Sequence, residues 1–248
     1  MNRATSAVVL VVAVVALAGC ASNTNGTGST AGAPPRSSTP RFPSTSKAAS
    51  APDHSALAAV VLTSADVPSD WTGSPSSNND TPGPDSHQAQ LAACIGIPDS
   101  SPQQVAVADS EDFDKDNSTI SSSATSYKSQ TAITSDTRGI VNPKAPNCFA
   151  RALQSGMATQ LPNGATTSDF KVTLVPGANG GPTAVVGMIH ASFVVHTSGV
   201  AVPFYIDSAL IAGKLVEAEV DFFGFQTPIA ASIQRTAIDA VARRVAAI

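Results

Sequence analysis

The carboxyl-terminal half of the chain alternates hydrophobic and polar residues with a period of two, which is typical of β-strands. Four such segments, rich in β-branched residues, are followed by a segment with helical spacing. Because short turns join neighbouring antiparallel strands, this order predicts a β-meander that ends in a helix. The predicted strands span 167–175, 183–196, 200–212 and 215–224, and the helix spans 228–247, with Thr227 as its N-cap and Pro228 at its first position.

The region before the meander predicts short helices and one serine-rich strand. Together with the meander, these elements indicate an α+β fold, in which helices pack on an antiparallel β-meander sheet as an α/β sandwich. The predicted helices span 55–62, 88–95, 131–140 and 145–161, the strand spans 118–128, and 72–86 is a loop rich in Pro, Ser, Asn and Gly.

Two turns allow the strand register to be predicted. If residues 198–199 form a two-residue loop, Phe193 pairs with Phe204. If residues 212–214 form the next loop, Phe204 pairs with Phe222. Both turns then place the same set of apolar side chains on one face, so we expect these three rings to form a dry stripe beneath the last helix.

The opposite face of this predicted sheet carries a cluster of ionisable and hydroxyl groups. Two carboxylates in one row would repel each other unless a cationic group lies between them. The cluster is interpreted as a hydrated surface, a polar ligand cleft, or a metal or catalytic site, and these alternatives stay open. The possible ligand face consists of His190, Asp207 and Glu219 in one row and Ser192, Tyr205 and Asp221 in the next, with Glu217 and His196 further along.

The chain begins with the pattern of a bacterial lipoprotein signal peptide. Arg3 provides a positive charge, residues 7–17 form an apolar run, and residues 17–20 (LAGC) match the lipobox. A membrane-spanning helix needs about 20 apolar residues, and the run from 4 to 18 is shorter. The pattern therefore predicts a signal peptide over 1–19 and a diacylglycerol thioether on Cys20, with a further acyl chain such as palmitate on its amine. Two or more acyl chains anchor a protein stably to a membrane.

The residues after the lipobox are rich in Ser, Thr, Pro and Gly, and Phe42 is their only large apolar side chain. Such a segment cannot bury enough surface to offset the entropy of ordering its backbone. The sequence therefore predicts a lipidated cysteine and disordered tether over 20–52, followed by a single extracytoplasmic α+β domain over 53–248.

Composition excludes several classes of protein. The 14 Lys and Arg are outnumbered by 18 Asp and Glu, so no basic surface is available to neutralise nucleic-acid phosphates. No glycine-rich phosphate loop or dinucleotide fingerprint is present, and we expect no cofactor.

In the acidic run 109–116, alternating aspartates resemble the start of an EF-hand loop. Asn117 stands where Gly belongs, and Ser123 stands where the bidentate Glu belongs, so the run is predicted to be a solvated loop without metal.

Two cysteines remain once Cys20 carries lipid. In an exported protein such a pair indicates a disulfide, here between Cys94 and Cys148. A catalytic cysteine would need a neighbouring base, and the sequence around either residue supplies none.

The lipobox, the tether and the segments 64–71 (SADVPSDW) and 142–153 (NPKAPNCFARAL) resemble those of actinobacterial, mycobacterial-type cell-envelope lipoproteins. The final strand–strand–helix unit is similar to PsbP/Mog1-like domains and, in outline, to the extracellular sensor domain of the mycobacterial kinase PknH. The resemblance covers 1–22 and 55–248. It implies an α/β sandwich with a role in the envelope, and it transfers no catalytic residue.

These features lead us to expect a lipid-anchored module on the extracytoplasmic face of the cell membrane, which binds or senses a ligand without catalysis. Its partners would be the membrane, through the lipid, and a small molecule, lipid or envelope protein. A carrier of lipid or lipoglycan is the alternative, and it requires an open apolar cavity. An envelope hydrolase is the second alternative, and it requires a nucleophile such as Ser192 close to His190.

Overall fold

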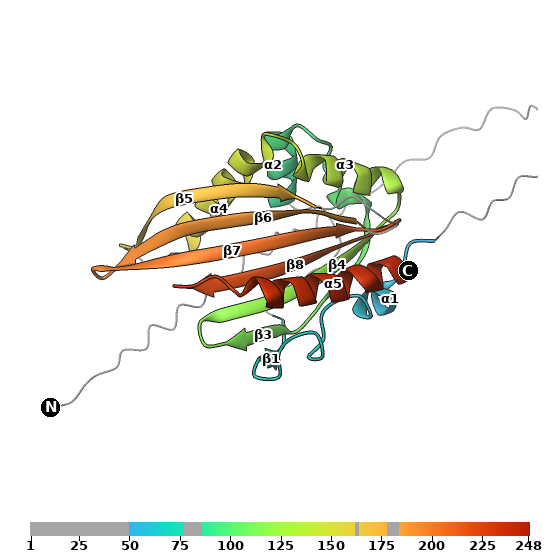
Figure 1. Ribbon diagram of the computed structural model, residues 1–248. Coiled ribbons are helices and arrows are strands. Elements are labelled where there is room, and N and C mark those ends of the chain that lie inside the picture. The colour runs from blue at the N-terminus through green and yellow to red at the C-terminus, as the bar shows by residue number, and fades with distance from the viewer. Residues whose placement is uncertain (1–49, 77–85, 162–163, 178–183) are drawn as a thin grey trace, which may run out of the picture.

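The computed structural model describes residues 50–76, 86–161, 164–177 and 184–248, and within them the alternating segments form an eight-stranded antiparallel sheet (Figure 1). The predicted signal peptide, Cys20 and most of the tether lie outside the described residues. The strands are β1 (Thr72–Ser74), β2 (Gln104–Asp109), β3 (Asp112–Lys115), β4 (Ser118–Tyr127), β5 (Thr166–Pro176), β6 (Ala184–Thr197), β7 (Val200–Ala212) and β8 (Val216–Phe225).

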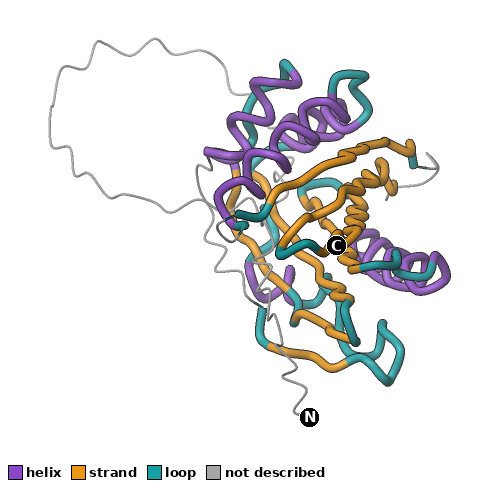
Figure 2. Tube along the Cα trace, turned by 90° about the vertical axis from the view of Figure 1, so that its left-hand side faces the viewer, coloured by secondary structure: helices purple, strands orange, loops and turns teal. Residues whose placement is uncertain are grey.

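Helices cover both faces of the sheet, as the side view in Figure 2 shows. The strand order is β1-β3-β4-β8-β7-β6-β5, and β2 pairs with β4 beside β3. Helices α1 and α5 pack on one face, and α2, α3 and α4 pack on the other. Their bounds are α1 (His54–Ala58), α2 (Ser86–Ile95), α3 (Gln130–Ile140), α4 (Ala145–Gln160) and α5 (Ala231–Ala247), with a short 3₁₀ helix, η1, over Ser101–Gln103. The predicted fold class, an antiparallel meander packed by helices, is confirmed.

The last helix begins three residues later than predicted. Gln226 N–H donates to the carbonyl of Pro203, and Thr227 N–H donates to the carbonyl of Phe225. These bonds hold the backbone in a turn, in which Gln226 has a φ of 68°. The N-cap is therefore Ala230, without a side-chain cap, and Thr227 does not cap the helix.

The acidic run is a strand and not the predicted solvated loop. Asp112 to Lys115 form β3, and Phe113 is only 1% exposed, because alternation turns its ring into the core while Asp114 faces outward. Asp116, with a φ of 51°, forms the turn that leads into β4. The predicted loop over 72–86 likewise contains β1, and its residues 77–85 lie outside the described part of the chain.

The register between β6 and β7 is as predicted, with Phe193 opposite Phe204. The register between β7 and β8 is wrong by three residues, because Phe204 pairs with Phe225 and Phe222 pairs with Asp207. The turn is longer than predicted, since Ala212 pairs with Glu217. An odd shift exchanges the two faces of a strand, so every side chain of β8 lies on the face opposite to the predicted one.

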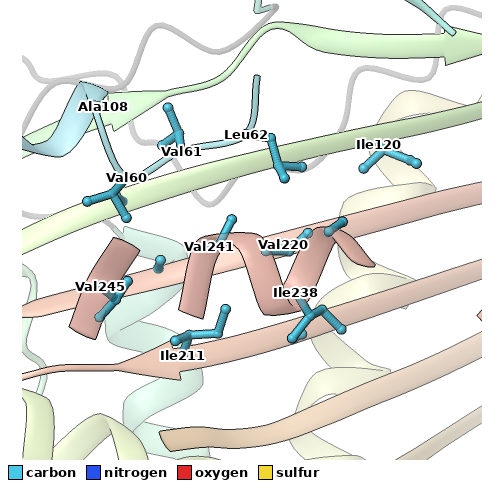
Figure 3. Packing of buried hydrophobic residues seen from close by; sticks show 14 of the residues in the cluster. Val60, Val61, Leu62, Ala108, Ile120, Ile211, Val220, Ile238, Val241 and Val245 are labelled. Carbon is cyan, nitrogen blue, oxygen red and sulfur yellow. The ribbon is translucent and has the colours of Figure 1, made fainter. Parts of the chain in front are cut away.

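The larger core lies between the sheet and the helices α1 and α5 (Figure 3). At one end of this core the backbone of Gly213 lies close to α5, because a Cβ there would be only 2.8 Å from Cγ1 of Val245. The buried side chains shown in Figure 3 include Val60, Val61, Leu62, Ile120, Ile211, Val220, Ile238, Val241 and Val245.

A row of phenylalanines crosses the other face of the sheet. Ring centroids are 4.8 Å apart for Phe170 and Phe193, 5.2 Å for Phe193 and Phe204, and 4.3 Å for Phe204 and Phe225. Met157 of α4 packs on this row. The predicted single stripe beneath the last helix is therefore wrong: Phe222 lies under α5, whereas the other two rings lie on the opposite face.

A disulfide joins Cys94 of α2 to Cys148 of α4, as predicted, with Cα atoms 5.8 Å apart. The bridge lies in a small cluster with Ile95 and Ala145. It therefore fastens two of the helices that cover the phenylalanine face.

Candidate functional site

Helix α5 packs on β8 and β7, and beside it strands β5 and β6 lie open on the same face (Figure 1). Two neighbouring cross-strand rows there consist of polar residues, since directly paired residues share one side of a sheet. We call these residues the open polar face: Thr173, His190 and Asp207 in one row, and Lys171, Ser192 and Tyr205 in the next.

A buried carboxylate orients the histidine of this face. Asp207 Oδ1 lies 2.5 Å from His190 Nδ1, and Asp207 Oδ2 accepts a hydrogen bond of 2.6 Å from Nε2 of Gln234. The side chain of His190 is 38% exposed, against 12% for Asp207. Contact with the carboxylate favours a proton on Nδ1, which leaves Nε2 to accept a hydrogen bond, or to donate one when the ring is protonated.

Each of the remaining groups of the open polar face can donate a hydrogen bond, and the hydroxyl groups can also accept one. Lys171 is exposed on β5, and Ser192 and Tyr205 contribute hydroxyl groups. Both oxygens of Asp207 already have partners within the fold, so this carboxylate does not compete for a donor. The arrangement therefore suits a ligand that is rich in acceptor oxygens or carries negative charge.

Within the described residues, no serine, threonine or cysteine forms a hydrogen bond with His190. The same residues contain no group of three His, Cys, Asp or Glu side chains that could hold a metal ion. The geometry therefore offers an oriented imidazole without the adjacent nucleophile that the hydrolase alternative requires.

Glu219 and Asp221 do not belong to this face, and their predicted place beside His190 is wrong. Glu219 pairs with Leu210, and Asp221 pairs with Ser208. The three-residue shift of β8 turns both carboxylates to the side that carries α2, α3 and α4. Glu219 is exposed there and accepts a hydrogen bond from the Ser208 hydroxyl.

A second polar cluster lies on this opposite face, where α3 packs against β4 and β6, the strands that flank β8 and β7 in the sheet. Glu217, which the predicted register placed beyond the ligand face, is only 6% exposed. Asp136 of α3 accepts a hydrogen bond of 2.5 Å from Ser100 Oγ, which in turn accepts one of 2.9 Å from Gln88 Nε2. We call Ser100, Tyr127, Asp136 and Glu217 the buried carboxyl cluster.

Burial shifts the titration of this cluster. Desolvation raises the pKa of Asp136 to about 6, although the hydroxyl of Ser100 opposes the shift. Desolvation, and then the charge of Asp136, raise the pKa of Glu217 well above its usual value. Burial also raises the pKa of Tyr127 and, further along β8, that of Asp221, which lies near the charge of Glu219. Charged forms are disfavoured in such surroundings.

Sequence reasoning missed several of these residues. Lys171 could have been found from alternation along β5, since it lies two residues from Thr173 and its side chain therefore faces the same side of the sheet. Gln234 and Asp136 lie on helices, and no local pattern indicates which strand residue a helical side chain will contact. Turns and alternation therefore could not predict that Gln234 and Asp136 belong to these sites.

An apolar pocket lies at the end of the phenylalanine row. Its walls include Met157, Phe193, Phe204, Phe223 and Phe225, and its volume is about 50 Å³. Pockets for small molecules typically measure about 300–1,000 Å³. This pocket is too small for the acyl chain of a carried lipid.

No helix in the described part of the chain is both long enough and apolar enough to cross a membrane.

Comparisons with known proteins identify no family for this chain. No family model matches the chain, and no curated protein matches it. Among solved structures, it is similar to the extracellular domain of PknH from Mycobacterium tuberculosis, with a TM-score of 0.41 and 12% sequence identity. The likeness covers 80% of this chain and 99% of that one. It transfers no residue or activity to this protein.

Proposed function

We propose that this chain is a lipid-anchored cell-envelope protein whose folded domain, residues 53–248, binds an anionic or acceptor-rich ligand on the open polar face without catalysis. In this proposal the signal peptide over 1–19 is removed, Cys20 carries the lipid, and the tether over 20–52 holds the domain away from the membrane on its extracytoplasmic side. The module thus binds or senses a ligand at the cell envelope.

One observation carries the binding proposal. A buried carboxylate whose two oxygens both have partners holds His190 at the part of the sheet face, over β5 and β6, that no helix of the described chain covers. Orienting a half-exposed imidazole in this way fixes the direction of one hydrogen bond in advance, which reduces the entropy lost on binding. Lys171 and the neighbouring hydroxyls supply further donors at the spacing of a sheet.

Binding can be tested with inorganic phosphate and with a galacturonate oligomer, titrated separately at constant ionic strength. We expect a saturable shift of the His190 ring resonances in NMR spectra for at least one probe. Lys171→Ala and His190→Ala are each expected to weaken binding about tenfold, the typical effect of losing a charge-assisted hydrogen bond.

Glu219→Gln is the matched control, because Glu219 is exposed on the opposite face of the same sheet and should leave the affinity unchanged. Absence of any shift with both probes would contradict the proposal. Equal weakening by the control and by Lys171→Ala would place binding elsewhere.

The anchor is tested by Cys20→Ala in cells that process lipoproteins. We expect this variant to leave the membrane pellet and to appear in the fraction extracted without detergent, because two acyl chains are needed for stable anchoring. Ser29→Ala is the control, since it changes a residue of the predicted tether and leaves the lipobox and the disulfide intact. Retention of the Cys20→Ala chain in the membrane would show that lipid on this residue is not the anchor.

A further inference from the structure

The buried carboxyl cluster is not used by the proposed function, because it lies on the opposite face of the sheet from His190. Its central residues are Asp136 of α3 and Glu217 of β8. Helix α3 and strand β8 are far apart in sequence, and the two side chains meet where α3 packs on the sheet. The cluster therefore lies at the contact between the helical layer and the sheet.

The contacts of the pair provide fewer hydrogen-bond donors than two carboxylates require. Ser100 Oγ donates to Asp136 Oδ2 at 2.5 Å. Tyr127 can donate its single hydroxyl proton to Glu217. Glu217 Oε1 has no hydrogen-bond partner, although the side chain is more than nine-tenths buried. An ionised Glu217 would leave a charged oxygen unsatisfied, at high cost.

The electrostatic surroundings also oppose a second negative charge. The ionisable groups that act on the pair are Tyr127 of β4, Asp99 before η1 and Glu219 of β8, and all three are acidic. The cations on the packed elements and adjoining turns are Lys128, Arg138 and Lys214. None of these three forms a salt bridge with the pair within the described chain, and Nζ of Lys128 donates to the carbonyl of Pro102.

We propose that Asp136 and Glu217 form a proton-binding site, in which one proton shared by the two carboxyls holds α3 against β8. A hydrogen bond between a carboxylic acid and a carboxylate satisfies both groups with a single negative charge. Burial opposes each ionisation of the pair, and loss of the last proton leaves two carboxylates in contact, so the attachment of α3 weakens stepwise as the pH rises. The disulfide joins α2 to α4 and does not include α3.

The direction of the pH effect follows from the raised pKa of both groups. The folded protein binds these protons more tightly than the unfolded chain does, so their stabilisation is complete below the pKa of an unfolded carboxyl, about 4. It is lost as the pH rises through the pKa of Asp136, which is about 6, and further losses follow as Glu217 ionises. Each group changes the folding equilibrium constant about tenfold per pH unit within its range.

The test measures urea unfolding of the full chain, with its disulfide intact, between pH 4 and pH 8. In the wild-type protein, ionisation of Asp136 should contribute a fall of about 30-fold in the folding equilibrium constant between pH 4 and pH 6. Asp136→Asn and Glu217→Gln imitate the protonated acids. They should flatten this dependence and fold at least about tenfold more favourably than the wild type at pH 7. Asp239→Asn, an exposed substitution on α5, should follow the wild-type curve.

Infrared spectroscopy provides a second readout that does not depend on a folded variant. The wild-type protein should show the C=O stretch of a buried protonated carboxylic acid at pH 7, and Glu217→Gln should remove the component that belongs to Glu217, leaving the contribution of Asp221. The proposal is overturned if the wild type lacks the band at pH 7. It is also overturned if both variants keep the wild-type pH dependence, or if they lose stability equally at pH 5 and pH 7. Because ligand binding is measured on the other face, failure of either proposal leaves the other intact.

Discussion

Replacing Cys94 and Cys148 together by serine is expected to lower the free energy of unfolding by about 4 kcal/mol. The bridge closes a segment with a sequence separation of 54, and without it the unfolded chain gains the conformational freedom of that loop. A loss of this size is a large fraction of the stability of an ordinary domain. The measurement is urea unfolding of both proteins under the same conditions.

Addition of a reductant is the internal control for this experiment. It should bring the wild type close to the serine variant and should leave the variant unchanged. If the variant unfolds at the wild-type urea concentration with the same slope, the bridge does not contribute to stability in this way.

Phe222→Ala is also expected to cost about 4 kcal/mol, because the ring is completely buried beneath α5 and its removal leaves a cavity between the helix and the sheet. Phe223→Ala is the matched control on the neighbouring residue. That ring lies on the opposite face and is partly exposed, so its loss should cost about half as much.

This pair of variants also tests the register of β8. The three-residue shift places Phe222 under α5, opposite Asp207 and in the same core cluster as Val220. If β8 had the register expected from a three-residue turn, Phe222 would be aligned with Phe204. Equal losses for the two variants, or a larger loss for Phe223→Ala, would contradict the register described here.

The sequence predicted most elements of the fold because their signals are local. Periodic alternation indicated the four meander strands, and helical spacing indicated α2, α3 and α4 nearly to their ends. The short strand β3 was missed because its acidic residues are typical of a loop, and only the burial of Phe113 makes the segment a strand. In this segment the local composition favours a loop, but tertiary packing makes it a strand.

Part of the candidate site was also predictable. His190 and Asp207 were correctly paired because a two-residue turn at Ser198 and Gly199 leaves little freedom in the register of β6 and β7. Glu219 and Asp221 were assigned to the wrong face because the next turn is longer. In a strand, a register error of an odd number of residues exchanges the faces entirely.

The sequence alone determined the four meander strands, the strand β4 and most of the helices, which cysteines pair, and that His190 lies beside Asp207. Only the tertiary structure decided which face each side chain of β8 occupies, that Gln234 completes the contacts of Asp207, and that Asp136 meets Glu217. The physical reason is the range of the interactions. Periodicity and tight turns act within a few residues, whereas the burial of two carboxyls together depends on a helix and a strand about 80 residues apart that come into contact only when the whole core forms.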